Sequence, residues 1–594
     1  MSKVKMTLSK MMNIFLFFVI YLLGFIIQGK IIYEVTGPFS HLFEEFYKDK
    51  DLMHYMTSPL KEEYADIHID DKYADVQYFF DVLESSCASL PYMEKEYNFS
   101  ANELEARYLE IISDASSDYE YVGTLIAMIH SIPSDHIGHL APDYDRYFIE
   151  YGSAYENMIT TINLDSDCIR MCNSWDRLLT EKGKEHNSDK SVLIMRNGND
   201  LYEYYFYENN TVSFSNIKEI LTYNGLNYDD YTLNELTAEK MQFDRKEKKL
   251  VKWKHNLYFE PSETSHSVIV KALMTDGTIK DIEMYNDYCR DIAISHYRNS
   301  KEFAEENSNV SQNPYKILYY YDDVENNTGY ISINQFHYSY TDMWNNAIDE
   351  ISSKNLIVDL RKCIGGQEGF FTDVIYPSLV NENMEMLLDA YVPLTEYTCR
   401  ESFYTKKIDI VKANLFSELL EPPFLQTNQK FFHQRERIYL NGGNSKFKEI
   451  YILVGDDTYS CGDKMAYIMK NCKNVTVIGH NTKGDGLGSG SLCSSLTFRK
   501  SIYAEQMPES KLFFTYTPQI SINEDGKVNQ VFGTPPDVYV EYTDENVLSE
   551  SVMKISEENN DPYAPYTYNN RRIWDTVLNT AVAMSTEDSK EDIR

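Results

Sequence analysis

Short runs of apolar residues, bounded by polar turns, recur through the second half of the chain. Runs of this length that are rich in Val, Ile, Leu and Tyr are typical of buried strands. The clearest runs cover residues 330–336, 355–360, 450–454, 475–479 and 537–542. We therefore expect these segments to be the strands of a core of the α+β or α/β class, in which helices connect parallel strands.

The pattern over residues 40–121 is helical instead. Ser100 and Glu103 match a capping box, in which the serine side chain and the glutamate stabilise the start of a helix. The apolar residues that follow on one face of this helix are Leu104, Tyr108 and Ile111. We expect an N-terminal helical segment before the core.

Between residues 192 and 284 the pattern changes to that of strands. The segments 217–225 and 266–284 are rich in β-branched residues, and Asp276-Gly277 is a typical hairpin turn. The charged segment 233–249 between them is predicted to be helical. A polar linker over 299–313 then separates this β-rich module from the core.

The N-terminus combines a basic start with a long apolar run. Lys3, Lys5 and Lys10 precede an uncharged run over residues 11–29, which is close to the ~20 residues that span a bilayer. No cleavage site of small residues follows it. We expect an uncleaved signal anchor that leaves everything after residue 30 outside the cytoplasm. The alternative is a cleaved signal peptide and a secreted protein.

The charge balance is strongly acidic, with 92 Asp and Glu against 56 Lys and Arg and a formal net charge of −36. Such a surface repels nucleic acid, so we exclude nucleic-acid binding as a function. The nine cysteines are scattered and form no CxxC pair. Neither a zinc site nor a disulfide framework is predicted, and we expect no metal and no other cofactor.

The candidate chemistry centres on Ser460. An Asp456-Asp457 turn follows the strand run 450–454, and apolar residues return at helical spacing from Cys461 onward, so Ser460 lies where a strand becomes a helix. The free N–H groups and the dipole of a helix N-terminus favour the negative charge that develops when a hydroxyl attacks a carbonyl. Serines at such positions also commonly cap helices.

Glycines follow two of the predicted strands. Gly365-Gly366 comes after the run 355–360, and Gly484 and Gly486 come after the run 475–479. Glycine adopts positive φ readily and can turn backbone N–H groups toward a ligand. We expect Gly365, Gly484 and Gly486 to contact substrate.

Four motifs occur in order over about residues 329–541: NLIVDLRKCIGG, DDTYSCGDKMAY, VTVIGHNTKGDG and GTPPDVYVE. Their order and intervals resemble those of the tail-specific and tricorn-type serine peptidases. The resemblance implies a crotonase-like (ClpP-like) peptidase core with βαβ units and a peptide or protein substrate. It implies that Ser460 is the nucleophile, rather than the neighbouring thiol of Cys461. The N–H groups of Gly366 and Cys461 would then hold the oxyanion.

The general base is expected among the three histidines of residues 129–140. A serine hydroxyl is a poor nucleophile until a base takes its proton, and an imidazole that titrates near neutral pH does so well. Ser134-Asp135-His136 is similar to a short Asp-Gly-His-Thr-like motif of the Ser–His branch of the family, which identifies His136 as the candidate base. His139 is the alternative, and His130 is expected to be structural.

Two positions depart from the family pattern. The Ser–Lys branch carries a lysine in the loop after the VIG strand, where this chain has Asp485, with Lys483 two residues away. The resemblance is therefore closer to the Ser–His branch. That branch has a carboxylate shortly before the Gly-x-x-Pro-Asp motif, and the matching position here is Gln530. A glutamine can orient an imidazole but cannot stabilise its charged form, so Glu524 and Asp525 are alternatives.

The family inserts a PDZ-like domain between its histidine segment and its core, and the β-rich module occupies that place. A plain structural insert is the alternative to a peptide-binding PDZ-like domain. The expected organisation is a cytoplasmic tip and signal anchor (1–30), a helical segment with the catalytic histidine (31–150), a PDZ-like insert and linker (151–315), a peptidase core (316–584) and a disordered tail (585–594).

These features together predict a membrane-anchored, extracytoplasmic serine peptidase that works through an acyl-enzyme. The alternative is a catalytically silent protein on the same scaffold that binds peptides or apolar ligands, which the departures at Asp485 and Gln530 favour. An α/β-hydrolase esterase is excluded because no Gly-x-Ser-x-Gly elbow surrounds Ser460. The oligomeric state does not follow from these patterns.

Overall fold

The computed structural model describes most of the chain after residue 70. The described residues are 71–134, 136–139, 166–196, 202–209, 211–228, 241–244, 249–252, 254–300, 317–393, 395, 397, 431–487, 503–540 and 567–591. Apart from the start of helix α8, the elements below belong to one compact unit, residues 68–163 and 172–594. The predicted anchor over 11–29 and most of the predicted linker over 299–313 lie outside the described residues.

The core is a six-stranded sheet in which the five predicted runs each contain a strand. Strands β13, β14, β17, β18 and β22 are parallel, and β12 is the antiparallel edge. The order across the sheet is β12 (Leu318–Asp323), β13 (Thr328–Ile333), β14 (Asn355–Asp359), β17 (Glu449–Val454), β18 (Val475–Gly479) and β22 (Val538–Tyr539). Strands β14 and β17 are buried over nearly their whole length, as expected for parallel strands covered on both faces.

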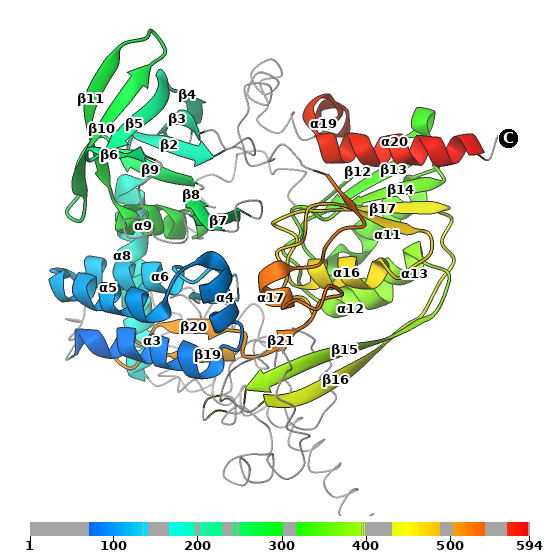
Figure 1. Cartoon of the computed structure of the whole chain (residues 1–594), viewed down its shortest axis with the longest axis horizontal. Helices are drawn as coiled ribbons and strands as arrows, with labels where there is room; N and C mark the ends of the chain where they lie inside the picture. The colour runs from blue at the N-terminus through cyan, green and yellow to red at the C-terminus, as the bar shows by residue number, and fades with distance from the viewer. Residues whose placement is uncertain are drawn as a thin grey trace, which may run out of the picture. The chain divides into compact units, whose positions relative to one another are not determined.

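Helices cover both faces of this sheet (Figure 1). On one face, α11 (Thr341–Glu350), α12 (Glu368–Phe370), α13 (Tyr376–Leu379) and α16 (Cys461–Met469) pack on Leu356, Ile450 and Ile452. On the other face, α19 (Tyr568–Trp574) and α20 (Thr576–Glu591) pack on Ile357, Tyr451 and Leu453. Alternate residues of each strand therefore belong to different hydrophobic cores, as the pleat of a strand requires.

Helix α20 extends further than the sequence predicts, since disorder was expected from residue 585 onward. Ser585 is fully buried, and its hydroxyl lies 2.7 Å from the hydroxyl of Thr328 on β13. The side-chain amide of Asn355 also donates to the Ser585 carbonyl. These contacts with the core sheet anchor the helix beyond residue 584, and it continues to Glu591.

The N-terminal helical segment contains α3 (Lys72–Ser86), α4 (Leu90–Tyr97), α5 (Ala101–Asp114) and α6 (Asp118–Ile129). Helices α3, α5 and α6 begin where the sequence supplies capping side chains. Asp71 caps α3, Ser100 caps α5 by accepting from the Glu103 N–H as predicted, and Ser117 caps α6.

A small sheet joins this segment to a late part of the chain. Its order is β1 (Gly138–His139), β20 (Phe513–Tyr516) and β19 (Tyr503–Gln506), all antiparallel. Gly138 pairs with Thr515, so the strand that follows His136 is held by residues far along the sequence.

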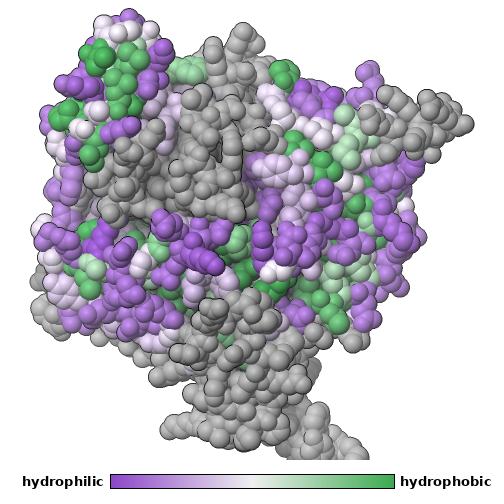
Figure 2. Space-filling model, in the orientation of Figure 1, coloured by the Kyte–Doolittle hydropathy of each residue, from purple (hydrophilic) through white to green (hydrophobic). Residues whose placement is uncertain are grey.

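The predicted β-rich module is an eight-stranded antiparallel sheet. Its order is β4 (Thr211–Phe214), β3 (Tyr202–Glu208), β2 (Ser191–Arg196), β9 (Lys254–Tyr258), β11 (Ile279–Asn286), β10 (His266–Met274), β5 (Ile217–Tyr223) and β6 (Leu226–Asn227). The predicted Asp276-Gly277 hairpin turn joins β10 to β11, and Gly277 has φ +83°. Figure 2 shows green, hydrophobic residues on the part of the surface formed by β10 and β11, where Ile269 and Ile279 are exposed.

The helix predicted over 233–249 is not observed in the residues of this segment that are described. Instead, β7 (Met241–Asp244) pairs with β8 (Lys249–Lys252) as an antiparallel ladder. Charged residues at roughly helical spacing favoured a helix, but cross-strand pairing decided the local structure.

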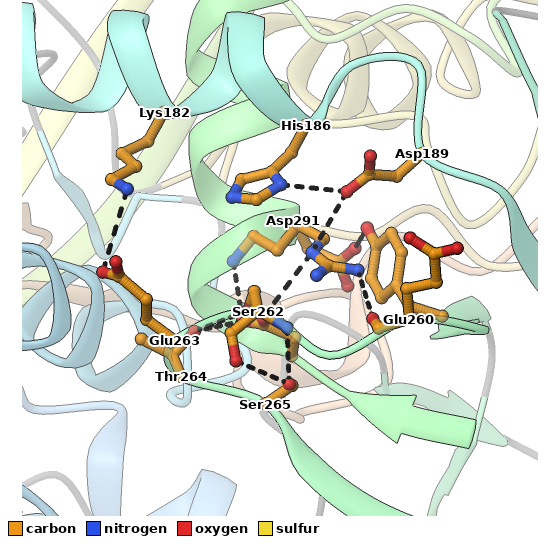
Figure 3. Close-up of polar contacts among 12 residues, drawn as sticks. Lys182, His186, Asp189, Glu260, Ser262, Glu263, Thr264, Ser265 and Asp291 are labelled. Carbon is orange, nitrogen blue, oxygen red and sulfur yellow. Dashed lines mark hydrogen bonds and ion pairs between the residues drawn. The ribbon is translucent and has the colours of Figure 1, made fainter. Parts of the chain in front are cut away.

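Helices α8 (Ser166–His186) and α9 (Tyr288–Asn299) are linked by partly buried polar contacts (Figure 3). His186 Nδ1 lies 2.9 Å from the Asp189 carboxylate, and Arg290 Nε lies 3.5 Å from the same carboxylate. Asp287 caps α9 by accepting from the Arg290 N–H. The charged groups pair with one another, so the cluster serves to hold the two helices together.

A long antiparallel pair of strands extends from the core (Figure 1). It consists of β15 (Met384–Pro393) and β16 (Phe431–Leu440), and β15 pairs on its other side with the short strand β21 (Ile520–Ser521). Among the helices of the described part of the chain, none is both long and apolar enough to cross a bilayer.

Candidate active site

Ser460 lies between β17 and α16, at the strand-to-helix turn that the sequence predicts. Its backbone has φ +52° and ψ −123°, a combination that non-glycine residues rarely adopt and that is often found at active sites. The Ser460 hydroxyl makes no capping hydrogen bond to α16. The residue therefore does not act as an ordinary helix cap.

The glycine pair after β14 packs directly against this turn. Gly365 has φ +86° and Gly366 has φ +129°. A Cβ atom on Gly365 would lie only 2.7 Å from the Cys461 nitrogen and 2.8 Å from Ser460 Cβ. A larger residue would thus collide with the serine turn. The backbone segments that carry the Gly366 and Cys461 N–H groups are consequently in contact beside Ser460.

The second glycine segment packs on the other side of the turn. The Ser460 N–H donates to the Gly484 carbonyl at 3.1 Å, and Tyr459 and Gly484 form a parallel bridge. A Cβ atom on Gly486 would lie 2.2 Å from the Ser460 carbonyl oxygen. Gly484, Asp485 and Gly486 are therefore adjacent to the serine turn.

His136 contacts Asp485 within this segment. His136 Nδ1 lies 2.6 Å from Asp485 Oδ2, and both side chains are buried, with exposed fractions of 9% and 2%. The hydroxyls of Tyr459 and Thr517 lie 3.2 and 3.4 Å from the same carboxylate oxygen. The His136 ring also packs against the Tyr459 ring, with centroids 4.6 Å apart. Because Tyr459 precedes Ser460, the histidine lies beside the serine turn.

Asp463 holds the Asp485 segment onto helix α16. Its two carboxylate oxygens accept from the Thr482 hydroxyl and from the Gly486 N–H, the latter at 3.0 Å. Burial raises the pKa of Asp463, and the hydrogen bond from Thr482 opposes that effect. Since Asp463 lies one turn after Ser460 on the same helix, it connects the serine to the segment that carries Asp485.

His136 reaches this place through the small sheet. The Thr515 hydroxyl donates to the His136 carbonyl at 2.9 Å, and Gly138 pairs with Thr515 on β20. His139 is a residue of β1, and His130 is the C-cap of α6. The position of His136 is thus set by packing between the helical segment and residues near 515.

The family pattern predicts that Gln530 orients the histidine. In the structure, the side chain of Gln530 forms its hydrogen bond with another segment. Gln530 lies on α17 (Asn529–Phe532), and its side-chain carbonyl accepts from the Ser521 N–H at 3.0 Å. Glu524 pairs with Lys470. The carboxylate that contacts His136 is Asp485, which the motif comparison treated only as a departure from the lysine of the Ser–Lys branch.

Lys464 and Lys483 are two lysines near the turn. Lys464 Nζ donates to Glu368 at 2.8 Å, and both residues are buried. Lys483 donates its backbone N–H to the Thr458 carbonyl. Within the described ranges, no cluster of three or more His, Cys, Asp or Glu side chains is arranged to hold a metal ion.

Comparison with known families finds one match. Residues 327–540 match the sequence model of peptidase family S41. This span coincides with the four motifs and contains Ser460, Asp485 and both glycine segments. His136 lies before it. No curated protein matches the chain in sequence.

Several solved structures are distantly similar to the chain. The crystal structure of mature CPAF is 12% identical, covers 79% of this chain and 92% of its own, and has a TM-score of 0.43. The photosystem II D1 C-terminal processing protease is 11% identical, with coverages of 81% and 95% and a TM-score of 0.29. The tricorn protease is 12% identical, with coverages of 87% and 37% and a TM-score of 0.28.

Proposed function

We propose that the protein is a serine peptidase of family S41, with Ser460 as nucleophile, His136 as general base and Asp485 as the carboxylate that orients the base. The contact between His136 and Asp485 beside the serine turn carries this proposal. The match of residues 327–540 to the family supports the reaction class. Asp485 takes the role that alignment assigned to Gln530.

The geometry suits acyl transfer. Asp485 at Nδ1 favours the tautomer in which the other ring nitrogen, Nε2, can accept the Ser460 proton, and its charge stabilises the imidazolium that forms. Ser460 then attacks the scissile carbonyl, and the leaving amine takes the proton from His136. Water hydrolyses the acyl-enzyme by the same proton transfers in reverse.

Backbone N–H groups would hold the oxyanion of each tetrahedral intermediate. The Gly366 and Cys461 N–H groups belong to segments that pack together beside Ser460. Losing one such donor typically costs roughly 3–4 kcal/mol of transition-state stabilisation. The substitution Gly365→Ala is expected to disturb this arrangement, because its Cβ would collide with the turn.

A Ser–His–carboxylate mechanism agrees with the surroundings of the site better than a Ser–Lys dyad does. Asp485 occupies the position at which the Ser–Lys branch has its lysine. Lys464, one helical turn after Ser460, forms a buried ion pair with Glu368. That amine therefore already has a carboxylate as partner.

The proposed location of the enzyme is the outer side of a membrane, with residues 11–29 as an uncleaved anchor. Full-length protein should then remain in the membrane pellet after alkaline washing, and a chain without residues 1–30 should be released. If N-terminal sequencing shows that the mature protein begins after residue 30, the segment is a cleaved signal peptide instead.

The test of the activity is labelling of the full chain with a fluorophosphonate probe, followed by peptide mass mapping. We expect an adduct on Ser460 in the native sequence and none in Ser460→Ala. His136→Ala should slow labelling by several orders of magnitude, because nucleophile and base act as a unit. A folded native protein that neither reacts with the probe nor cleaves a peptide library would contradict the proposal and favour a silent binding protein.

A further inference from the structure

Tyr459, the residue immediately before Ser460, contacts both glycine segments through its backbone. Its N–H donates at 2.9 Å to the carbonyl of Cys363, which lies two residues before Gly365. On its other side it forms a parallel bridge with Gly484. The residue is buried, with an exposed fraction of 7%. Since Ser460 follows directly, a displacement of Tyr459 would also displace the proposed nucleophile.

The side chain of Tyr459 contacts both proposed partners of the nucleophile. Its ring packs on the His136 imidazole, with centroids 4.6 Å apart and planes inclined by 53°. Its hydroxyl donates to Asp485 Oδ2 at 3.2 Å. A phenylalanine ring would fill the same space, so packing alone does not account for a hydroxyl that is directed at a buried carboxylate. One side chain therefore contacts both the base and the carboxylate that orients it.

The hydroxyl of Tyr459 binds the carboxylate oxygen that faces the base. His136 Nδ1, the Tyr459 hydroxyl and the Thr517 hydroxyl all lie within 3.4 Å of Asp485 Oδ2. Among the described residues, none donates to the buried Oδ1 atom of Asp485. Rotation about the terminal torsion of an aspartate is soft, and donors on one oxygen oppose it. Hydrogen bonds to a charged acceptor are roughly twice as strong as neutral ones, and a buried site strengthens them further.

The ring of Tyr459 restrains the imidazole in a similar way. A histidine ring also turns readily about its terminal torsion. During the proposed reaction the ring has to keep Nδ1 on Asp485 while Nε2 accepts the Ser460 proton. The Tyr459 ring lies against the His136 imidazole, and the His136 carbonyl accepts from the Thr515 hydroxyl. The histidine is thus held at both its ring and its backbone.

We propose that Tyr459 is a positioning residue of the site: its ring fixes the plane of the His136 imidazole, and its hydroxyl fixes the Asp485 oxygen that faces Nδ1. The inference rests on the proposed function and adds a residue to its machinery. Tyr459 takes no proton in the reaction and acts through His136 and Asp485. A rotated carboxylate or imidazole lowers the fraction of molecules that are ready to react. Loss of either contact should therefore slow the attack by Ser460 without weakening the binding of the reactant.

The test measures the rate at which a fluorophosphonate probe labels Ser460 in the full chain, as a function of probe concentration. Tyr459→Phe keeps the ring and removes the hydroxyl. We expect the maximal labelling rate to fall about tenfold, with the half-saturating probe concentration changed by less than about twofold. Tyr459→Leu loses both contacts and should lower the maximal rate by at least about a hundredfold.

The matched control is Tyr451→Phe. Tyr451 is a buried tyrosine of β17 that packs in the core on the other face of the sheet, so this variant should label at the native rate. Magnetic resonance of the chain with isotope-labelled histidine gives a second readout. The Nδ1 proton resonance of His136, identified by its loss in His136→Ala, should shift in Tyr459→Phe and not in Tyr451→Phe.

A maximal rate that is unchanged in folded Tyr459→Phe, or that falls equally in Tyr451→Phe, would overturn the inference. A slower rate with an unshifted His136 resonance would also overturn it, because the effect would then arise elsewhere. The native chain separates the two proposals. Native labelling that Tyr459→Phe leaves unchanged contradicts only the role of Tyr459. A folded native chain that neither reacts with the probe nor cleaves peptides contradicts the proposed function, and the inference with it.

Discussion

Asp485 holds its carboxylate against His136 from an unusual backbone conformation, with φ +60°. Aspartate tolerates this left-handed region better than most residues do. The neighbouring Gly484 and Gly486 allow the segment to pass close to Asn529 and to the Ser460 carbonyl. The glycine segment itself thus holds the carboxylate in place. One carboxylate oxygen, Oδ2, accepts hydrogen bonds from His136, Tyr459 and Thr517.

Replacing Asp485 by Asn is therefore expected to lower kcat by on the order of 10³–10⁴, because an amide neither enforces the required tautomer nor stabilises an imidazolium. Steady-state hydrolysis of a peptide, with circular dichroism to verify folding, measures the effect. The comparison variant is Gln530→Glu, which keeps the oxygen that accepts from Ser521. An unchanged kcat in Asp485→Asn together with a raised kcat in Gln530→Glu would return the orienting role to Gln530.

Helix α3 is tied to the segment before β20 by one buried carboxylate. Asp75 accepts from the N–H groups of Glu509 and Ser510 at 2.7 and 2.8 Å, and from the Tyr121 hydroxyl at 2.9 Å. Burial raises the pKa of Asp75, and these hydrogen bonds oppose the effect. The contact joins the helical segment to the turn that leads into β20, the strand that pairs with the residues after His136.

The substitution Asp75→Ala leaves these donors without a partner and is expected to cost at least about 1–3 kcal/mol of unfolding free energy. Because the small sheet positions His136, we also expect faster amide exchange in residues 503–516 and slower labelling of Ser460. Urea unfolding and hydrogen exchange measure both effects. In Asp75→Asn, which retains an acceptor oxygen, the losses should be smaller; equal or no loss in the two variants would refute the argument.

The two ends of the core are joined by a network of buried charges. Arg361, which follows β14, forms paired hydrogen bonds with Asp359 and with Asp575 at the junction of α19 and α20. Arg571 also donates to Asp359, at 2.8 Å. Since Arg361 begins the segment that ends in Gly365-Gly366, the C-terminal helices support the loop on which the proposed oxyanion donors lie.

Removing one partner from such a network leaves an uncompensated buried charge. Asp575→Ala is accordingly expected to destabilise the fold by about 3–5 kcal/mol. The control is Asp342→Ala, an exposed carboxylate on α11, whose loss should change stability by less than about 0.5 kcal/mol. Chemical unfolding measures the midpoint of each variant. Indistinguishable midpoints would show that the network contributes nothing to the stability of the fold.

The same network predicts how the unfolding free energy depends on pH. Burial alone would raise the pKa of Asp359, but the Arg361 guanidinium, and then that of Arg571, hold this pKa well below its usual range. A carboxyl with a depressed folded-state pKa stabilises the fold above its unfolded-state pKa, which is about 3.9. That contribution is lost as pH falls below about 4 toward the folded-state value.

We therefore expect the unfolding free energy of the native chain to decrease steeply between about pH 4 and pH 2. The unfolding free energy of the Asp359→Asn variant should decrease less over this interval. Urea unfolding at successive pH values gives the two slopes. Parallel slopes for the native chain and the variant would show that other carboxyls dominate acid unfolding.

The residues alone determined the strands of the core sheet, the serine turn after β17, the helix cap at Ser100 and the hairpin at Asp276-Gly277. Each of these depends on a periodicity or a turn preference within some ten neighbouring residues. Only the tertiary structure decided the partner of His136, because Asp485 lies 349 residues further along the chain. The β7–β8 pairing in a charged segment and the continuation of α20 past residue 584 likewise depend on contacts that only the folded chain brings together. Local patterns specify elements, whereas the packing of β1 on β20 and of Gly484 on the serine turn assembles the site.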